Sequence, residues 1–327
     1  MNTRRRIVLA LGAGALAAPL ASFAQKPPKI ARIGFLGATS ASASQSRVDA
    51  LKAGLRDLGY IEGKNLLIEF RWADGKYEQL SELAAELVRL KVDVLVTHGT
   101  PGIRAAKQAT TTIPIVMATV SDPVATGLVA SLRQPGGNVT GVMIFIQELN
   151  EKRLELVREV FPKARRVAIL ANPENDSMKP IIPALEVAAK ALKLEFKRFD
   201  VRGPEEFEKA FAAMVAARAD AVVAIDDAML IANAKGIVEH ASKRRLPLIG
   251  WNEVADYGGF LSYGVNFPDM FRRSAFYVDK ILKGARPADL PVERSTRFEL
   301  VINMKTVNAL GVKLPQSVLV RADRVIE

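Results

Sequence analysis

The sequence predicts an α/β protein built from two doubly wound parallel-sheet lobes, joined by a hinge of several chain crossings. Three observations support this fold class. Short apolar runs alternate with amphipathic helical segments, the alternation is repeated once along the chain at similar spacing, and polar residues follow most of the apolar runs. Two such lobes enclose a cleft, and ligand contacts are expected there.

The repeat is visible in the positions of the predicted strands. Their first residues are 33, 66, 92 and 113 in the first half, and 167, 194, 220 and 246 in the second half. The intervals are about 33, 26 and 21 residues against about 27, 26 and 26. Such regular self-similarity indicates internal duplication, so each half predicts one lobe.

The first 24 residues are expected to lie outside this fold. They comprise a basic start (MNTRRR), an apolar stretch rich in small residues, and Ser22-Phe23-Ala24 as a cleavage site. The apolar stretch is shorter than the roughly 20 residues that span a bilayer. We therefore predict a signal peptide (residues 1–24) that is cleaved near Ala24, exported by either the general secretory or the twin-arginine route.

Composition narrows the location and the kind of partner. The chain has 327 residues, enough for two ordinary domains, and no cysteine, which excludes disulfides, thiolate nucleophiles and a lipoprotein anchor. A soluble periplasmic protein is therefore expected. The formal charge is +11, or +8 without the three arginines of the leader, and it is spread along helices. No nucleic-acid partner is predicted.

The first half follows the pattern of strands covered on both faces. The strand near Ile33 leads into a helix with an apolar stripe, and Gly59 ends this helix. A second striped helix leads directly into the strand VDVLVT. The stripes are Val48, Leu51, Leu55 and Leu58, and Leu80, Leu83, Leu87 and Leu90. The run IPIVMATV is the fourth strand, and VTGVMIF, after the turn at residues 134–138, is the fifth.

The chain is expected to cross between the lobes near Ile146, before a helix from about Leu149 to Phe161. Beyond the second set of strands, residues 259–264 predict a strand and residues 270–282 a helix, both assigned to lobe one. Residues 298–303 (FELVIN) predict a last strand in lobe two. Lobe one is thus predicted to contain residues 27–146 and 258–285, and lobe two residues 147–257 and 286–327.

The loops after the strands of lobe one supply hydroxyls and backbone amides. Right-handed crossovers bring these loops to one edge of the sheet, where they suit a carboxylate or another small anion. The candidate ligand-binding residues are Thr39, Ser40, Ser42, Thr97, Gly99, Thr100, Ser121 and Asp122. Each can instead cap a helix or form a turn. Asp122 is expected chiefly to cap a helix entering at Val124, and His98 is a further candidate beside Gly99.

In lobe two the candidates are Asn172, Asp226, Trp251 and Asn252. Asp226 and Asp227 end a buried strand, where one carboxylate can meet an ammonium group while the other caps the helix near Ala228. Trp251 offers a flat face to a ring or cation, or packs between the lobes. Asn172 either contacts ligand or forms a turn before Pro173.

The sequence contains none of the common catalytic or metal-binding motifs that we considered. There is no G-x-S-x-G or H-E-x-x-H motif, and the two histidines with no cysteine leave no metal-ligand set. Gly12-x-Gly14-x-x-Ala17 imitates a dinucleotide fingerprint but lies in the leader. Residues 59–64 are one residue short of a phosphate loop. The sequence therefore predicts no enzyme, no cofactor and no metal.

From Lys29 to Glu327 the chain resembles ABC-transporter substrate-binding proteins related to tryptophan- and tyrosine-binding components of bacterial uptake systems. The shared phrases include ARIGFLGATS, VDVLVTHGT, SDPVATGLVASLRQPGGNVTG, LSYG and FELVINMKTVNALGV. The resemblance implies the type I periplasmic-binding fold and a monomer that captures a solute by hinge closure and presents it to a membrane permease. It also implies Thr100 and Ser121 for a ligand carboxylate and Asp226 for an amine.

Two other functions stay open on the sequence. An exported enzyme could use Asp226, Asp227 or Glu253 as acid and base. A ligand sensor could use the same fold to signal to a membrane partner. For the receptor, the ligand is expected to be an amino acid or an aromatic or carboxylate metabolite, by analogy with the family.

Overall fold

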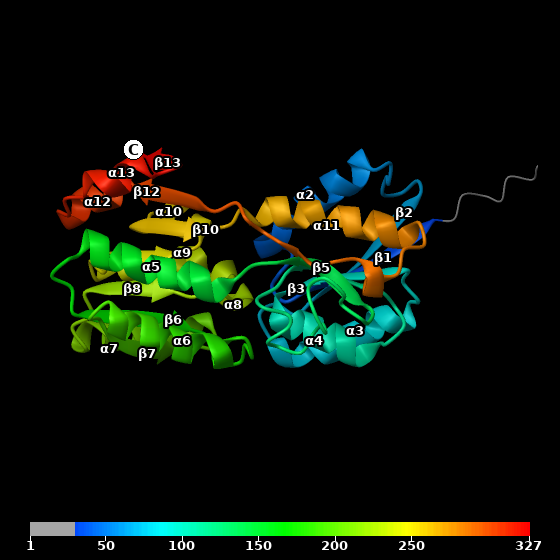
Figure 1. The fold of residues 1–327 in the computed structure, drawn as a ribbon, viewed down its shortest axis with the longest axis horizontal. Coiled ribbons are helices and arrows are strands. Elements are labelled where there is room, and N and C mark those ends of the chain that lie inside the picture. The colour runs from blue at the N-terminus through cyan, green and yellow to red at the C-terminus, as the bar shows by residue number, and fades with distance from the viewer. Residues whose placement is uncertain (1–29) are drawn as a thin grey trace, which may run out of the picture. The chain divides into compact units, whose positions relative to one another are not determined.

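The computed structural model describes residues 30–327, of which Ala31–Glu327 form one compact unit. The predicted signal peptide and the Gly12–Ala17 pattern lie outside the described residues. Within the described part, two sheets are each covered by helices (Figure 1). No described helix is both long and apolar enough to span a membrane.

The first sheet has the strand order β11-β5-β4-β3-β1-β2, and every neighbouring pair is parallel. Its strands are β1 (Ala31–Gly37), β2 (Leu66–Trp72), β3 (Val94–His98), β4 (Ile115–Thr119), β5 (Val139–Met143) and β11 (Glu293–Arg294). The central strands β3, β4 and β5 are buried along their whole length, as continuous apolar runs require.

Helices cover both faces of this sheet. They are α2 (Gln45–Asp57), α3 (Leu80–Arg89), α4 (Gly99–Ala109) and α11 (Phe267–Leu282), with the short turns η1 (Ser42–Ser44), η2 (Tyr77–Gln79) and η4 (Pro287–Asp289). Val94 and Val96 of β3 share a core with α2 and α11, whereas Leu95 shares another with α3 and α4. This alternation fixes which side chains of β3 face which helices. We call the sheet and these helices lobe one.

The second sheet has the order β13-β12-β10-β9-β8-β6-β7, parallel except where β10 meets β12. Its strands are β6 (Arg166–Ala171), β7 (Glu195–Asp200), β8 (Ala221–Ala224), β9 (Leu248–Gly250), β10 (Leu261–Gly264), β12 (Glu299–Asn303) and β13 (Arg324–Ile326). Two sheets dominated by parallel pairs confirm the predicted fold class. The closing strand FELVIN lies in the second sheet, as predicted.

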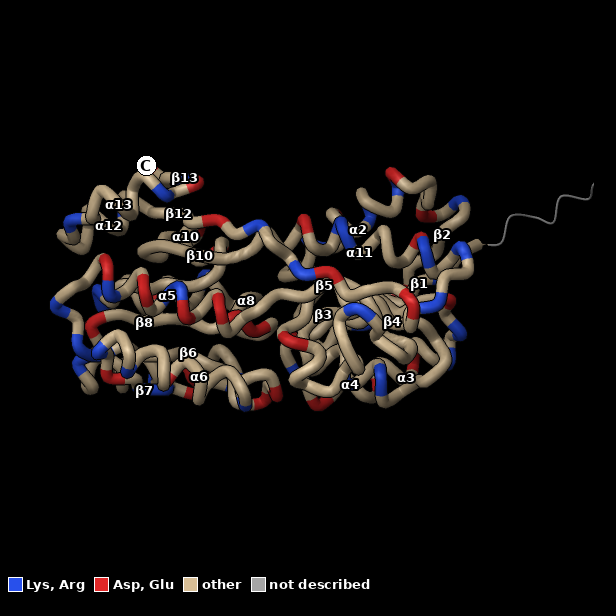
Figure 2. The backbone as a smooth tube through the Cα atoms, in the orientation of Figure 1, with Lys and Arg blue, Asp and Glu red and all other residues tan. Residues whose placement is uncertain are grey.

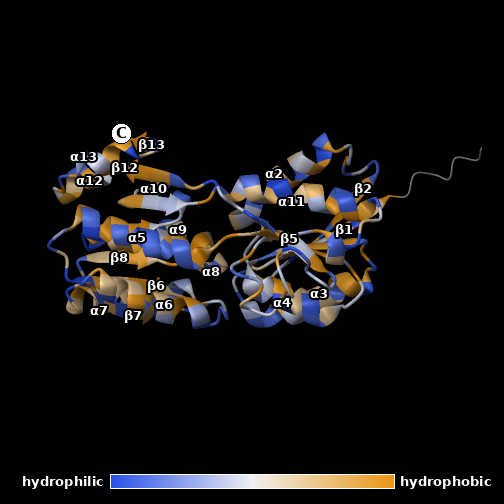
Figure 3. Cartoon of the chain, viewed as in Figure 1, coloured by the Kyte–Doolittle hydropathy of each residue, from blue (hydrophilic) through white to orange (hydrophobic). Residues whose placement is uncertain are grey.

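We call the second sheet and its helices lobe two. The helices are α5 (Ile146–Val160), α6 (Met178–Ala191), η3 (Pro204–Glu206), α7 (Phe207–Ala216), α8 (Ala228–Ala232), α9 (Ala234–Lys243), α10 (Asn252–Asp256), α12 (Met304–Leu310) and α13 (Gln316–Val320). Most strands of both lobes are hydrophobic, whereas the helices carry both hydrophobic and hydrophilic residues (Figure 3). Basic and acidic residues are interspersed over the helices of both lobes and form no single block (Figure 2).

Within residues 31–327 the chain passes between the sheets three times, after β5, after β10 and after β11. Two segments differ from the expectation. Residues 258–264 were assigned to lobe one, but β10 pairs with β9 and β12, so only α11 returns to lobe one. Residues 286–294 were assigned to lobe two, but β11 pairs with β5 in lobe one. The reason is that the apolar pattern of a strand is the same in either sheet.

The helix expected at Val124 is absent, and residues 123–127 form turns instead. Asp122 still caps this segment, because its Oδ1 accepts the backbone N–H of Val124 at 2.9 Å and of Ala125 at 3.0 Å. Gly127 adopts a φ of +70°, which continues no helix.

Candidate functional site

One cavity is lined by residues from both lobes. The space between its atoms is about 490 Å³, part of which is open solvent. Lobe one contributes the ends of β3 and β4 with parts of α2 and α11. Lobe two contributes the loop before α6 and the start of α8. This is the strand-end location that the sequence predicted.

Where α4 begins, lobe one presents hydrogen-bond donors to the cavity. Gly99 has a φ of +70° and opens α4, so the first amides of this helix have no partner within the helix. Thr100 and Ser121 line the cavity from α4 and from the residue pair after β4. Thr100 is 2% exposed, and its Oγ1 is buried without a hydrogen-bond partner. Such a group of donors can bind a carboxylate.

A different set of residues faces the cavity from α2 and α11. Arg47 of α2 is buried, with its guanidinium 5.2 Å from the centre of the Phe267 ring. His98 lies 5.5 Å from Phe271, ring centre to ring centre. Arg47 Nε and His98 Nε2 are buried and have no hydrogen-bond partner. This part of the cavity therefore combines aromatic surface with two unsatisfied nitrogens.

His98 is neutral in this environment. Burial disfavours the imidazolium, and the positive charge of Arg47 nearby adds to the effect, so the pKa of His98 falls to about 3. One ring nitrogen of a neutral imidazole donates and the other accepts. His98 thus offers hydrogen bonding without charge at any ordinary pH.

In lobe two, Asp227 is the centre of a dense hydrogen-bond network. Its Oδ1 accepts from Asn172 Nδ2 at 3.2 Å and from two backbone amides of α8, which it caps as expected. Its Oδ2 accepts from Tyr77 Oη and Asn175 Nδ2, each at 2.9 Å. Burial raises the pKa of Asp227, and these hydrogen bonds oppose that rise. Five donors saturate the four lone-pair positions of one carboxylate.

Asp226 has a single partner, the guanidinium of Arg153 on α5. Arg153 Nη2 donates to Asp226 Oδ1 at 3.1 Å and Nη1 donates to Oδ2, and both side chains are almost fully buried. Arg153 is held in turn by the carbonyls of Tyr263 and Ala224, at 2.9 and 3.2 Å. Each oxygen of Asp226 keeps one lone-pair position open.

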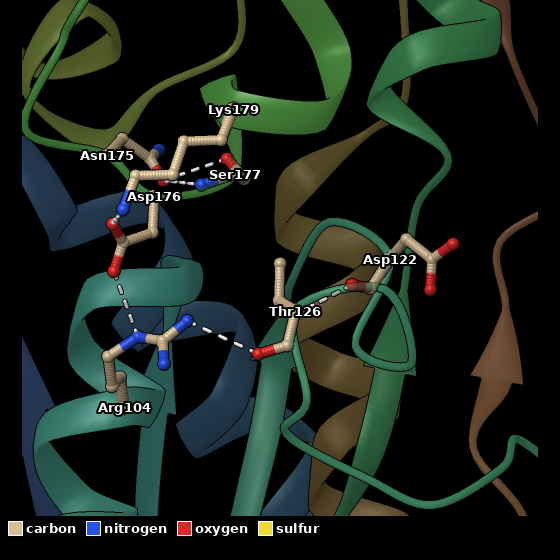
Figure 4. Close-up of polar contacts among 7 residues, drawn as sticks. All are labelled: Arg104, Asp122, Thr126, Asn175, Asp176, Ser177 and Lys179. Carbon is tan, nitrogen blue, oxygen red and sulfur yellow. Dashed lines mark hydrogen bonds and ion pairs between the residues drawn. The ribbon is translucent and has the colours of Figure 1, made fainter.

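Several polar contacts join the lobes around the cavity, among them the backbone N–H of Met229, which donates to Tyr77 Oη at 3.1 Å. Tyr77 of lobe one donates to Asp227, and Arg47 pairs with Glu253 of α10 at 3.0 Å. Arg104 of α4 pairs with Asp176, Nε to Oδ2, at 3.1 Å, and donates to the carbonyl of Thr126 (Figure 4). The last pair is over one third exposed and does not line the cavity.

Of the predicted ligand residues, Gly99, Thr100, Ser121 and Asp226 line the cavity, as does the further candidate His98. The others lie outside its lining and make structural contacts. In lobe one, Thr39 shares a hydrogen bond with Ser44, Ser40 with Ser42, and Thr97 donates to the carbonyl of Leu36. Asp122 caps its turn.

In lobe two, Asn172 holds Asp227 and accepts the backbone N–H of Glu174. Trp251 is fully buried in the main hydrophobic core. Asn252 donates to Glu299 at 3.0 Å. These three residues do not line the cavity either.

Sequence reasoning missed Arg47, Phe267, Phe271, Asn175 and Ser177, which also line the cavity. Arg47 lies one helical turn before Leu51, at the start of the apolar stripe of α2, and a charged residue on that face is a signal that could have revealed it. Asn175 and Ser177 lie three and five residues after Asn172, which the sequence did single out. Phe267 and Phe271 look like ordinary core positions of α11.

Comparisons with known proteins agree with this geometry. A family model described as ABC transporter substrate-binding protein matches residues 32–326. A tyrosine-binding protein of Clostridioides difficile (strain R20291) is 29% identical over 260 residues, which cover 79% of this chain and 74% of that protein.

Solved structures of similar fold include solute-binding proteins. A conserved domain protein of Vibrio cholerae is 29% identical, with a TM-score of 0.85 over 91% of this chain and all of that one. A Streptococcus pneumonia protein in complex with L-Trp is 27% identical, with a TM-score of 0.83 over 90% of this chain and 99% of that one. A 5-methylthioribose-bound solute-binding protein of Thermotoga lettingae is 13% identical (TM-score 0.64, 90% of this chain, 92% of that one), and shares the fold.

Proposed function

Because this chain belongs to the family of ABC transporter substrate-binding proteins, we propose that it is a periplasmic receptor, acting as a monomer, for an amino acid with an aromatic side chain. It holds this ligand between its lobes and delivers it to an ABC-type permease. The observation that carries the proposal is one cavity with donors on lobe one and carboxylates on lobe two. That is the complement of a zwitterion.

The ligand carboxylate is assigned to the beginning of α4. Thr100 Oγ1 has no partner, Ser121 lines the same cavity, and the free amides of α4 carry partial positive charge. A carboxylate here would satisfy a buried hydroxyl that is otherwise costly to bury.

The ligand ammonium is assigned to Asp226 and not to Asp227. Asp227 is saturated by five donors, whereas Asp226 has one open position on each oxygen. Arg153 fixes the position of the Asp226 carboxyl group, so Asp226 can contribute to an ammonium without moving. We assign Asp227 the structural role of capping α8 and receiving Tyr77.

We assign the aromatic side chain of the ligand to the part of the cavity formed by Phe267 and Phe271. Aromatic rings favour offset or edge-to-face packing with a ligand ring. The L-Trp complex of the pneumococcal protein and the tyrosine-binding relative both support an aromatic amino acid. We also propose that the protein performs no reaction, because a general base needs a free, accessible carboxylate. Asp226, Asp227 and Glu253 each accept from another side chain, so none is a carboxylate without a protein partner.

The test is calorimetric titration of protein that has been unfolded and refolded to remove any bound ligand. L-tryptophan, L-tyrosine and L-phenylalanine are compared with tryptamine, which lacks the carboxylate, and with indole-3-propionate, which lacks the amine. We expect at least one of the amino acids to bind and both analogues to bind at least tenfold more weakly. Absence of binding by all three amino acids contradicts the proposal.

Single substitutions of Asp226 and Asp227 test which of the two carboxyl groups binds the ligand ammonium and which one has a structural role. Asp226→Asn should remove most of the difference between L-tryptophan and indole-3-propionate. Asp227→Asn should lower the affinity for both compounds alike, because it disturbs α8 and the Tyr77 contact. The opposite pattern would move the ammonium to Asp227.

A further inference from the structure

Tyr77 joins the two lobes by hydrogen bonds that involve no ligand atom. It lies in η2 of lobe one, and its hydroxyl donates to Asp227 Oδ2 at 2.9 Å and accepts the backbone N–H of Met229 at 3.1 Å. Asp227 and Met229 belong to lobe two, where they form the start of α8. Tyr77 itself does not line the cavity. We call these three residues the clasp.

Apolar packing surrounds the clasp on the lobe-one side. The Tyr77 side chain packs against both of the hydrophobic clusters, and Ala228 of α8 packs against the cluster that lies under α3 and α4 of lobe one. A Cβ placed at Gly75 would lie 3.9 Å from Met229 Cγ, so the turn before Tyr77 also lies close to α8. Removal of the Tyr77 hydroxyl alone would leave this packing in place.

The Tyr77 hydroxyl keeps its proton. Burial raises the pKa of Tyr77 well above its usual value of 10.0, and the negative charge of Asp227 adds to the effect. The protonated hydroxyl donates to Asp227 and accepts from Met229 at the same time. Both hydrogen bonds of the clasp therefore form together, and both are lost when the lobes separate.

Other contacts between the lobes are more dependent on salt or on ligand. Arg104 and Asp176 are each over one third exposed, so solvent and salt weaken this pair. Arg47, which pairs with Glu253, lines the cavity and has a buried nitrogen without a partner, so a bound ligand changes its surroundings. Asp227 also lines the cavity, but protein donors already occupy its oxygens.

We propose that Tyr77 is a positioning residue for lobe closure, which holds α8 against lobe one whichever ligand occupies the cavity. This inference rests on the proposed function and deepens it, because α8 contributes Ala228 and Ile231 to the cavity lining. Since every atom of the clasp belongs to the protein, the clasp favours closed lobes before a ligand binds and opposes their opening before a ligand leaves. Tyr77 thus controls how long a ligand stays bound and not which ligand is selected.

The first test uses ligand-free protein, so its outcome does not depend on the identity of the ligand. Small-angle X-ray scattering compares refolded wild type with Tyr77→Phe, which removes the hydroxyl and keeps the ring. The ratio of closed to open lobes should fall about 3- to 10-fold, because hydrogen bonds between the lobes are lost. The average radius of gyration should therefore increase. An equal radius of gyration in both proteins overturns the inference.

The second test measures ligand release. Calorimetry and surface plasmon resonance compare L-tryptophan, L-tyrosine and L-phenylalanine on wild type and on Tyr77→Phe. Each amino acid that binds the wild type should dissociate about 3- to 10-fold faster from the variant, and its affinity should fall by no more than this factor. The affinity ratios between the amino acids should stay the same. Changed ratios with unchanged dissociation rates would mean that Tyr77 selects the ligand, and the inference would be wrong.

The two tests separate this inference from the proposed function. If none of the three amino acids binds the wild type, the proposed function is contradicted. The scattering comparison still decides whether Tyr77 holds the lobes together, because it uses no ligand.

Tyr60→Phe is the matched control. Tyr60 donates to Asp279 Oδ1 at 3.0 Å, and both residues belong to lobe one. This variant removes a comparable hydrogen bond between a tyrosine and an aspartate without changing the contact between the lobes. It should leave the radius of gyration and the dissociation rates unchanged, and thermal unfolding curves verify that both variants fold. Equal effects of Tyr60→Phe and Tyr77→Phe would mean that a general loss of stability explains the result, and would overturn the inference.

Discussion

The two walls of the cavity differ in how far their polar groups are satisfied. On lobe two, Asp227 accepts five hydrogen bonds and Asp226 is held by Arg153. On lobe one, Arg47, His98, Thr100 and Thr119 each keep a buried polar atom without a partner. A satisfied hydrogen-bond network is rigid, and its polar groups contribute little to the free energy of ligand binding. A buried polar group without a partner makes binding more favourable when the ligand supplies that partner.

This difference assigns separate tasks to the two walls. Lobe two contributes two carboxyl groups that protein donors hold in place. Lobe one holds the buried polar atoms that have no partner, so we expect most of the gain in hydrogen bonding on ligand binding to arise there. Substitutions in the lobe-two wall should therefore change folding stability first, and substitutions in the lobe-one wall should change ligand affinity first.

The largest expected effect is in the lobe-two wall. Arg153→Met leaves Asp226 buried without its counter-charge, and breaking a buried pair from one side costs about 3 to 5 kcal/mol. We expect the free energy of unfolding, measured by urea denaturation without ligand, to fall by that amount.

The double variant Arg153→Met with Asp226→Leu is the control. Replacing both partners by apolar groups removes the buried charge, so the double variant should be more stable than Arg153→Met alone. If the double variant is as unstable as the single one, lost packing and not the unpaired charge explains the effect.

How much of this contrast the sequence could predict depends on the range of the interaction. The strand ends, the turn at Asn172 and the capping role of one aspartate follow from local patterns, because turns, caps and parallel strands are set by neighbouring residues. The partner of Asp226 is 73 residues away on α5, and no local pattern connects the two residues. The sheet to which β10 belongs was mispredicted for the same reason.

The lobe-one wall shows the other limit of sequence reasoning. Thr100 and Ser121 follow strands and were predicted to lie at the cleft. Arg47, Phe267 and Phe271 come from α2 and α11, whose orientation over the sheet depends on packing between segments more than 200 residues apart. Arg47 is unusual in the sequence, since a charged residue stands at the start of an apolar stripe, but the sequence does not indicate which residue Arg47 contacts.

The next largest effect is a pH dependence that originates in lobe one. His98 has a pKa of about 3 in the folded protein, below the 6.5 of an unperturbed histidine. Below pH 6.5 the unfolded chain therefore binds a proton that the folded protein does not, and the folded state loses stability as the pH falls toward 3. At pH 5 this loss is about 2 kcal/mol.

The measurement compares urea denaturation at pH 7.5 and pH 5.0 in wild-type protein and in His98→Leu. The variant should lose about 2 kcal/mol less between these pH values than the wild type, because all other titrating groups are shared. An identical pH dependence in both proteins would mean that His98 accepts a proton in the folded state.

A smaller effect separates affinity from stability at Thr100. Its Oγ1 has no partner in the absence of ligand, so Thr100→Val removes no hydrogen bond and should change the free energy of unfolding by less than about 1 kcal/mol. Binding of an amino acid should weaken by about 1.5 kcal/mol, because a bond to a carboxylate is lost. Calorimetry and urea denaturation of the same variant measure both quantities. A loss of stability without a loss of affinity would reverse the tasks assigned to the two walls.

The smallest effect tests whether contacts between the lobes matter when they lie outside the cavity. Arg104 and Asp176 form such a contact, and both side chains are 38% exposed. Exposed pairs contribute about 0.2 to 1 kcal/mol and are screened by salt. Arg104→Gln should therefore reduce ligand affinity by less than about fivefold at low salt and by less still at 0.5 M salt. A loss above tenfold that persists at high salt would show that closure depends on this contact, so that the cavity walls alone do not determine affinity.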